Sequence, residues 1–395
     1  MVMSEKCSKF AVELTICVMS NVTYKIRVNR PCRLFIDDEE VMILDESKLT
    51  KISLPCGEYL RKVVAIDDRT IFDEAVINLT EASSKLDNII LDIKGLNEAR
   101  AIILQNGIFK VGELYYQSAG NYSVEVCYNE NEQYTFTDII IPEEIMYAGY
   151  RFMVSGIGSY AFAGCKTLSS VIIPDCITYI GESAFNDCNG LKLIKIPNGV
   201  TDIGEKAFCY CSSIIDLSIP NSVSIIQNEV FRGCSNLKSI KLPKTIDAIG
   251  GAVFSHCSSL ESIIIPEGVT ELNSHIIDTY DLPFETVDVI EGMFEACTKL
   301  SNIQFPNSLI KIGKRTFDRC SALASVSLPN SIKVIDDHAF RDCVTLISIT
   351  IPRSVNYIGD DVFWDCPSLK KIYLPRNVFM IGEMNLYKHT EIIQY

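Results

Sequence analysis

The sequence predicts a mainly β protein, in which a small antiparallel β-sandwich precedes a long solenoid of 23-residue repeats. Two patterns carry this prediction. Short strand-like runs separated by turn residues fill residues 1–96, which is typical of a sandwich of antiparallel strands. A Phe-x-x-Cys-x-x-Leu pattern then recurs at a fixed period from residue 162 onward, which indicates structural repeats that stack on one another.

The predicted sandwich begins with residues that alternate between apolar and polar side chains. Residues 10–19 follow this alternation, and Glu13 and Thr15 within them favour a half-buried strand over a signal peptide. Residues 22–28 alternate in the same way. Further strand-like runs occupy residues 34–36, 41–44, 52–54, 59–66, 75–79 and 89–93.

Residues 34–64 resemble a PEGA-type β-domain. That family places strands around an Ile-Asp-Gly turn and a Leu-Pro-x-Gly-x-Tyr turn, and residues 35–41 and 54–59 match these two motifs. Asp38 stands where the family has glycine in the first turn, and aspartate tolerates turn conformations. The resemblance implies a small all-β domain at the N-terminal end.

Residues 97–106 are predicted to form a short ordered linker, because they contain no strong run of Pro, Gly or Ser. The solenoid is predicted to occupy residues 107–395. Its first unit, residues 107–161, is longer than the others, although Ile141 and Pro142 already match the repeat. Because a terminal repeat has to cover the open end of the core, this expanded unit is predicted to act as a cap.

Each repeat places the same residue types at the same positions. Phenylalanine recurs at residues 162, 185, 208, 231, 254, 294, 317, 340 and 363. Cysteine follows three positions later and proline twelve positions later in every repeat. Stacked strands lie about 4.8 Å apart, so each column is expected to form a ladder through the core. Proline is expected to end the strand because it cannot donate a hydrogen bond, and the glycine column is expected to permit a turn.

The motif Ile-Gly-x-x-Ala-Phe-x-x-Cys-x-x-Leu-x-x-Ile-x-Ile-Pro resembles the BspA-like (Treponema-type) leucine-rich repeats nearly letter for letter. The resemblance covers about residues 107–395. It implies a right-handed leucine-rich-repeat solenoid with a parallel sheet on its concave side. It also implies a non-enzymatic function, commonly adhesion or protein binding at bacterial or protozoan surfaces.

Charge and composition exclude some partners. The formal net charge is −14, whereas nucleic acids and anionic lipids are bound by clustered lysine and arginine. We therefore expect a protein ligand and no nucleic acid, and the oligomeric state stays open. Every apolar stretch long enough to span a membrane is interrupted by charges, so no transmembrane segment is expected.

The chain contains 16 cysteines. Nine of them fall in one column of the repeat, so their number follows from the repeat, and free thiols suit a reducing compartment. These thiols, together with an N-terminus unlike a signal peptide, favour the cytoplasm. The family resemblance favours the cell surface or secretion instead.

The sequence contains no pattern that predicts an enzyme, a cofactor or a metal site. P-loop, His-Glu-x-x-His and zinc-finger motifs are missing. Residues 156–161 fit a loose Gly-x-Gly-x-x-Ala dinucleotide motif, but these are the repeat's own glycine and alanine columns. The cysteine column can also be interpreted as a metal or redox array. Because stacked side chains point in parallel, we favour reduced core thiols.

The first candidate for ligand binding is the strand face predicted to be concave. Residues eight and ten positions after each Phe are expected to point into solvent there. The candidates on this face are Ile172, Leu193, Lys195, Lys241, Ile264, Gln304 and Tyr373. The alternative is a neutral, serine-rich face that only contacts water.

The second candidate is an insertion at residues 273–289, which interrupts the 23-residue period. Insertions in solenoids form loops, often on a binding face. His275 and two aromatic residues among acidic ones, Tyr280 and Phe284, are the candidate contacts. An inert surface loop is the alternative.

These observations favour a non-enzymatic protein-binding scaffold that uses the concave sheet and the insertion, and a cell-surface adhesin is one such scaffold. Two other functions stay open. One is a structural or assembly module, and the other is glycan binding by the N-terminal β-domain.

Overall fold

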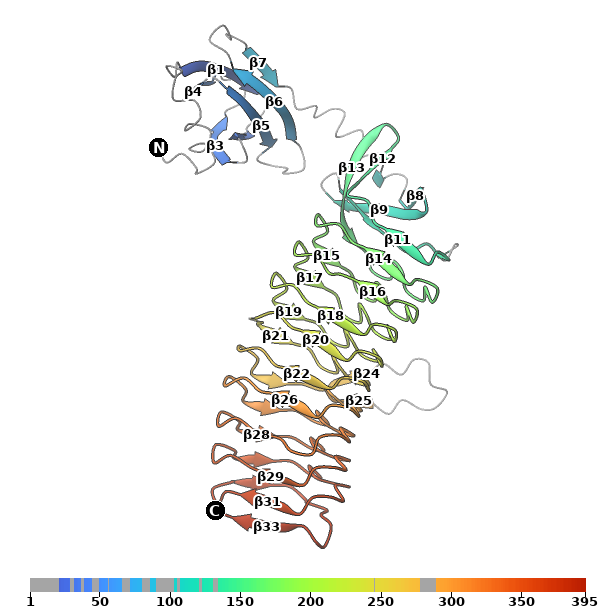
Figure 1. Ribbon diagram of the computed structural model, residues 1–395, viewed down its shortest axis with the longest axis vertical. Coiled ribbons are helices and arrows are strands. Elements are labelled where there is room, and N and C mark those ends of the chain that lie inside the picture. The colour runs from blue at the N-terminus through green and yellow to red at the C-terminus, as the bar shows by residue number, and fades with distance from the viewer. Residues whose placement is uncertain are drawn as a thin grey trace. The chain divides into compact units, whose positions relative to one another are not determined.

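In the N-terminal part of the chain, the computed structural model describes seven strands within residues 21–89. In the remainder it describes residues 103–104, 107–120, 123–130, 134–244, 246–277 and 289–395. The chain divides into two compact units, Met1–Ile102 and Ile103–Tyr395 (Figure 1). The strand predicted at residues 10–19 and the centre of the insertion lie outside the described residues. In the described part, the structure contains no helix long and apolar enough to cross a bilayer.

The first unit contains two sheets. Their strands are β1 (Asn21–Val28), β2 (Cys32–Ile36), β3 (Glu39–Leu44), β4 (Thr50–Pro55), β5 (Gly57–Ala65), β6 (Phe72–Leu79) and β7 (Leu86–Ile89). One sheet has the order β4-β1-β7 and the other β3-β2-β5-β6. The pairing of β1 with β7 is parallel, so the expectation of a purely antiparallel domain is wrong at this pair. The sandwich and the PEGA resemblance stay predictions.

The second unit begins with the expanded first repeat. Its strands are β8 (Phe109–Val111), β9 (Leu114–Gly120), β10 (Ser123–Val126), β11 (Asp138–Ile140), β12 (Glu144–Tyr147) and β13 (Tyr150–Ile157). β8, β9 and β10 pair antiparallel, and β10 then pairs parallel with β13. The rings of Tyr134 and Phe136 lie against Phe162, with centroids 5.4 and 6.3 Å away. Aromatic side chains of the first repeat therefore cover the end of the phenylalanine column.

The repeats that follow form two walls of parallel strands (Figure 1). The major wall continues β11 through β14 (Ser170–Ile172), β16 (Leu193–Ile194), β18 (Asp216–Ser218), β20 (Ser239–Lys241), β22 (Ser262–Ile264), β26 (Asn302–Gln304), β29 (Ser348–Thr350), β31 (Lys371–Leu374) and β33 (Glu391–Gln394). The minor wall continues β13 through β15 (Tyr179–Ile180), β17 (Asp202–Ile203), β19 (Ile225–Ile226), β21 (Ala248–Ile249), β23 (Glu271–Leu272), β27 (Lys311–Ile312), β28 (Val334–Ile335), β30 (Tyr357–Ile358) and β32 (Met380–Ile381).

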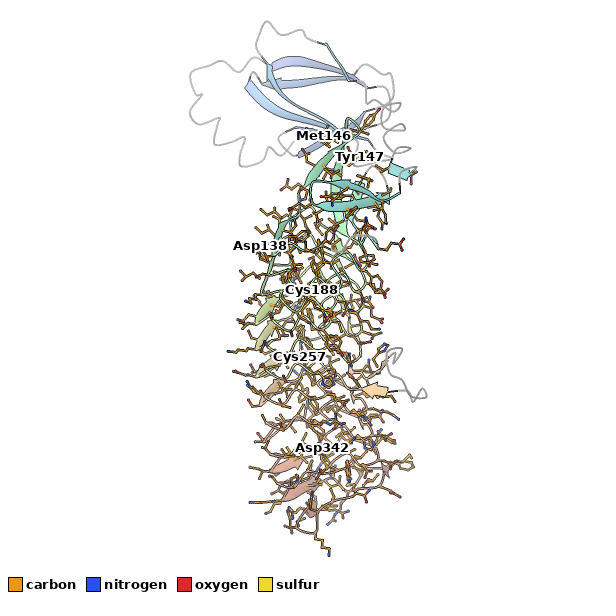
Figure 2. The ribbon with its side chains drawn as sticks, turned by 90° about the vertical axis from the view of Figure 1, so that its right-hand side faces the viewer. Asp138, Met146, Tyr147, Cys188, Cys257 and Asp342 are labelled. Atoms are coloured by element: carbon orange, nitrogen blue, oxygen red, sulfur yellow. The ribbon has the colours of Figure 1, made fainter. Side chains whose placement is uncertain are left out.

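The phenylalanine and cysteine columns form ladders between the walls. Successive Phe rings stack with centroids 5.2–5.8 Å apart and planes 2–18° apart. Cys188, Cys257 and their counterparts lie inside the stack (Figure 2). Each thiol from Cys188 onward donates to the carbonyl oxygen of the Phe in the preceding repeat, at 3.0–3.2 Å. The cysteines thus join neighbouring coils, in addition to filling space.

Glycine recurs in its column for a different reason from the one expected. Gly181 and Gly204 do not adopt positive φ. A Cβ atom on Gly204 would lie 2.5 Å from the backbone nitrogen of Glu182 in the preceding coil, and one on Gly181 would lie 2.5 Å from that of Ser159. Glycine is therefore needed at these positions for close approach of the coils, and the expectation that it permits a turn is wrong here.

The insertion starts and ends as a hairpin. Strands β24 (His275–Ile277) and β25 (Val289–Glu291) pair antiparallel, and His275 lies opposite Glu291. Residues 278–288, which connect the two strands, include Tyr280 and Phe284 and lie outside the described residues.

Candidate functional site

The major wall presents two columns of side chains to solvent. Residues eight and ten positions after each Phe flank a core residue, so period-two alternation along the strand turns them away from the core. Leu193 in the first column is 70% exposed, and Ile172 and Ile264 in the second are 58% and 65% exposed. Lys195, Lys241 and Gln304 are also exposed, whereas Tyr373 is half-buried.

The structure brings some of the predicted residues together with residues that the sequence analysis missed. Ile140 in the first repeat is 66% exposed and lies beside Ile172 in the strand register. Lys192 and Lys238 are exposed at the edge of the major wall, seven positions after their Phe residues. We call one set of exposed side chains the apolar–basic patch: Ile140, Ile172, Leu193, Lys192, Lys195, Lys238 and Lys241. The Ile-Pro signal at residues 141–142 could have revealed Ile140, since it fixes the register of the first repeat.

Ile264, Gln304 and Tyr373 belong to the same column but lie farther along the stack. Ile264 and Gln304 face each other across β22 and β26. Tyr373 lies opposite Thr350 and Ile393 in β29 and β33. The predicted candidates therefore cover the length of the major wall, and apolar and basic side chains occur together in this column from Ile172 to Ile264.

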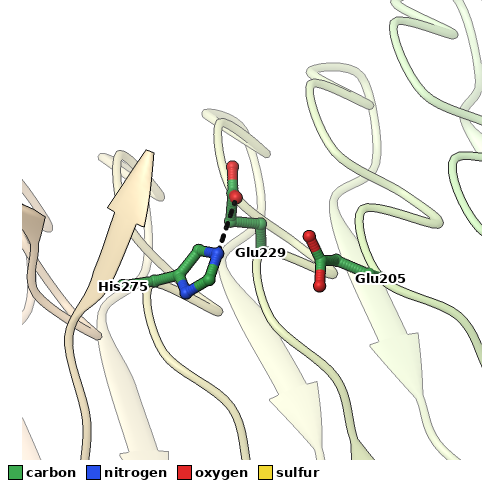
Figure 3. A group of neighbouring side chains, drawn as sticks. All are labelled: Glu205, Glu229 and His275. Carbon is green, nitrogen blue, oxygen red and sulfur yellow. Dashed lines mark ion pairs between the residues drawn. The ribbon is translucent and has the colours of Figure 1, made fainter. Parts of the chain in front are cut away.

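His275 does not project freely from the insertion. It is half-buried on β24, and its Nε2 atom lies 3.6 Å from Oε1 of Glu229 (Figure 3). The Glu229 side chain is 1% exposed, and burial raises its pKa although nearby positive charges oppose the shift. The Lys206 ammonium group lies 3.4 Å from Glu229 and 3.6 Å from Glu205. His275 thus ties the start of the insertion to the preceding repeats.

The far side of the hairpin is tied down by Glu291. Arg232 donates two hydrogen bonds to its carboxylate, at 2.7 and 2.6 Å, and the hydroxyl of Ser255 donates a third at 2.6 Å. Burial alone would raise the pKa of Glu291, but the hydrogen bonds from Arg232, His256 and Ser255 outweigh it and hold the pKa well below its usual range. Arg232 also lies 3.8 Å from Glu229. Arg232 therefore contacts Glu291 of β25 and also Glu229, which lies beside His275 of β24.

Glu205, Glu229 and His275 could in principle hold a cation, because their ligand atoms lie within 4.8 Å of one another (Figure 3). Lys206 already supplies positive charge to both carboxylates of this group. A divalent ion would have to compete with that ammonium group, so the arrangement fits an ion-pair cluster better than a metal centre.

The cysteine ladder lacks the features of a reactive or metal-binding array. Burial raises the pKa of Cys165 to about 11 and that of Cys366 to about 12. Because the thiolate is the nucleophile and the metal ligand, thiols with raised pKa values are poorly reactive. All cysteines of the ladder are free and buried.

Two parallel walls, a ladder core and a regular exposed face define the class of leucine-rich-repeat solenoids, which serve as protein-interaction scaffolds. The sequence profile of the BspA type Leucine rich repeat region matches residues 155–282 and 276–393, with 6 copies. The chain therefore belongs to the BspA-type leucine-rich repeat family, as its motif predicted. Right-handed coiling and a concave major wall stay predictions.

Solved structures of bacterial leucine-rich repeat proteins resemble this chain. TpLRR of T. pallidum is 25% identical, with 54% of this chain and 90% of that chain covered and a TM-score of 0.44. A leucine rich cell surface protein from Faecalibacterium prausnitzii is 21% identical, with 71% and 95% covered and a TM-score of 0.37. The pneumococcal vaccine antigen PcpA is 16% identical, with 73% and 93% covered and a TM-score of 0.36. No curated protein matches the chain.

Proposed function

We propose that this chain is a non-enzymatic, adhesin-type scaffold that binds a protein ligand through the major wall and the loop between β24 and β25. The proposal is supported chiefly by one observation. The residues exposed on the major wall differ from repeat to repeat, whereas the repeated Phe and Cys residues are buried in the core. A surface that varies over a constant core can specify a ligand without changing the fold.

The anchored hairpin supports the loop's part in this function. His275 and Glu291 attach β24 and β25 to Glu229 and Arg232 of an earlier repeat. Residues 278–288 are therefore attached at both ends to strands with fixed positions. Their aromatic residues Tyr280 and Phe284 are the side-chain types that contribute most at protein interfaces.

A peptide selection tests the proposal. Phage that display random peptides are selected on the immobilised full chain, and the affinities of the selected peptides are then measured for wild type and variants. We expect the double variant Ile172→Ser, Ile264→Ser to bind these peptides about tenfold more weakly, because both side chains offer apolar area to a ligand. Replacing residues 278–288 with a Gly/Ser linker is expected to weaken the binding of a subset.

Ile225→Ser is the matched control, because Ile225 is an exposed isoleucine on the minor wall. The peptides should bind this variant as they bind wild type. If no peptide can be selected, or if the control loses as much affinity as the double variant, the major wall is not a protein-binding face.

A further inference from the structure

We infer that the ligand of the major wall is an acidic protein segment with interspersed apolar side chains, and that the apolar–basic patch binds it. This inference rests on the proposed function, since it specifies the chemistry of the ligand for the same face. It assigns different tasks to the two halves of the patch. The apolar half contributes affinity, and the lysines select the charge of the partner.

The lysines form a regular group. Lys192 and Lys195 lie seven and ten positions after Phe185, and Lys238 and Lys241 lie at the same positions after Phe231. Two coils separate the pairs, which places them about 10 Å apart at a strand spacing of about 4.8 Å. All four side chains are exposed, and they therefore offer a compact set of positive charges.

Within the described residues, some basic side chains of the second unit form ion pairs, whereas others, including the four patch lysines, Lys299 and Lys333, do not. Lys166 pairs with Asp187, Lys314 with Asp337, and Arg232 with Glu291. Within the described residues, none of the four patch lysines takes part in an ion pair. A chain with 50 acidic and 36 basic residues has ample acids to neutralise them. Their lack of partners leaves positive charge for an external ligand.

Three acidic residues border the patch without cancelling its positive charge. Asp216 lies between the two lysine pairs, and its carboxylate already accepts a hydrogen bond from the hydroxyl of Ser239. Glu261 occupies the position after Lys238 in the same column. Asp138 lies on the same strand face as Ile140, beside Ser170. Four lysines against three acids leave the patch positive, in contrast to the net charge of −14 for the chain.

The apolar half of the patch favours a protein over a sulfated glycan. Ile140 and Ile172 are neighbours in the strand register, and Leu193 lies on the next strand. Ile215, which is 47% exposed, lies between Lys192 and Lys238 in its column. A glycan polyanion would use the lysines but leave these side chains in water. An acidic segment that also carries leucine or phenylalanine would cover both halves.

The test uses a dye-labelled synthetic peptide in which Glu and Asp alternate with Leu and Phe, and a second peptide in which Lys replaces every acid. Binding to the full chain is measured by fluorescence anisotropy at low and high salt. We expect the acidic peptide to bind and the basic one not to. The double variant Lys195→Glu, Lys241→Glu should bind the acidic peptide about tenfold more weakly and lose most of the salt dependence.

The control is Lys333→Glu with Lys299→Glu, which makes the same charge change outside the patch and should leave binding unchanged. The peptides selected on the major wall could instead be neutral and bind the variant Lys195→Glu, Lys241→Glu as tightly as wild type. That result would overturn this inference but not the proposed function. Binding of heparin in place of the acidic peptide would overturn it in favour of a glycan. Self-association in sedimentation velocity that the double variant abolishes would overturn it in favour of a second copy of the chain.

Discussion

At the residue scale, two positions in each repeat adopt a backbone conformation that most side chains avoid. The residues two before and two after each core Phe, except Gly292 before Phe294, have left-handed φ values, for example 56° at Glu229, 59° at Ala296 and 61° at Arg319. Only Gly164 and Gly233 fill such a position with glycine and positive φ. The chain therefore carries backbone strain at these positions, some of which hold charged side chains.

Ala296→Gly is expected to stabilise the protein by about 1 kcal/mol, because glycine adopts the left-handed region without steric cost. Its backbone N–H donates to the carbonyl oxygen of Asp318 at 2.8 Å, and glycine keeps this hydrogen bond. The change is measured as a shift of the urea unfolding midpoint. Ala324→Gly, at an exposed position without positive φ, is the control and should destabilise by about 0.5–1 kcal/mol. Equal signs for the two variants would contradict the argument.

The same positions mark a limit of what the sequence predicts. The Phe, Cys, Leu and Pro columns repeat one residue type, so their burial and stacking were predictable. The left-handed columns contain Lys, Glu, Tyr, His and Arg and give no such signal. The thiol–carbonyl bonds were also missed, because repetition of cysteine alone does not distinguish a hydrogen-bond donor from a small apolar side chain.

At the element scale, buried charged residues bind His275 and Glu291, the first residue of β24 and the last residue of β25. The sequence predicted the insertion because it breaks the period, and it named His275 as a candidate. It could not predict that Glu291 meets Arg232 and Glu229, because Glu291 follows Arg232 by 59 residues along the chain. Spatial neighbours of that kind come only from the stacking of coils.

Glu291→Gln is expected to change how stability depends on pH. The folded-state pKa of Glu291 lies well below its usual range, because hydrogen bonds from Arg232, His256 and Ser255 outweigh burial. Its stabilising contribution is therefore present above the unfolded-state value of about 4.3 and is lost as the pH falls below it toward the folded-state value. The variant should be less stable than wild type at pH 7 by about 3 kcal/mol, since Arg232 keeps a buried charge without its partner.

The measurement is the thermal unfolding midpoint of both proteins between pH 7 and pH 3. The difference between variant and wild type should shrink as the pH falls through the acidic range. Glu271→Gln removes the same charge from an exposed position on β23 and controls for the change in net charge. A difference that stays constant with pH would show that Glu291 acts by packing and not by its charge.

At the scale of the whole solenoid, stability depends on contacts between neighbouring coils. The Phe rings of the ladder stack on the Phe rings of neighbouring coils, and the ladder thiols donate to carbonyl oxygens of the preceding coil. Arrays of this kind open from their ends, because a terminal coil has one neighbour and a central coil has two. The first repeat covers one end with aromatic residues, whereas Phe379 in the last coil is 88% exposed.

The ladder cysteines make this expectation measurable. In the native full chain at pH 8, iodoacetamide should modify Cys366 faster than the central cysteines Cys234, Cys257 and Cys297. Burial raises the pKa of every one of these thiols, so each must be exposed by opening before it reacts. Half-buried Cys176, outside the ladder, is the reference for reaction without opening. Peptide mass spectrometry after timed quenching gives the separate rates. Equal rates along the ladder would mean that the coils open together as one cooperative unit, and fast labelling of all of them would contradict the assignment as buried core thiols.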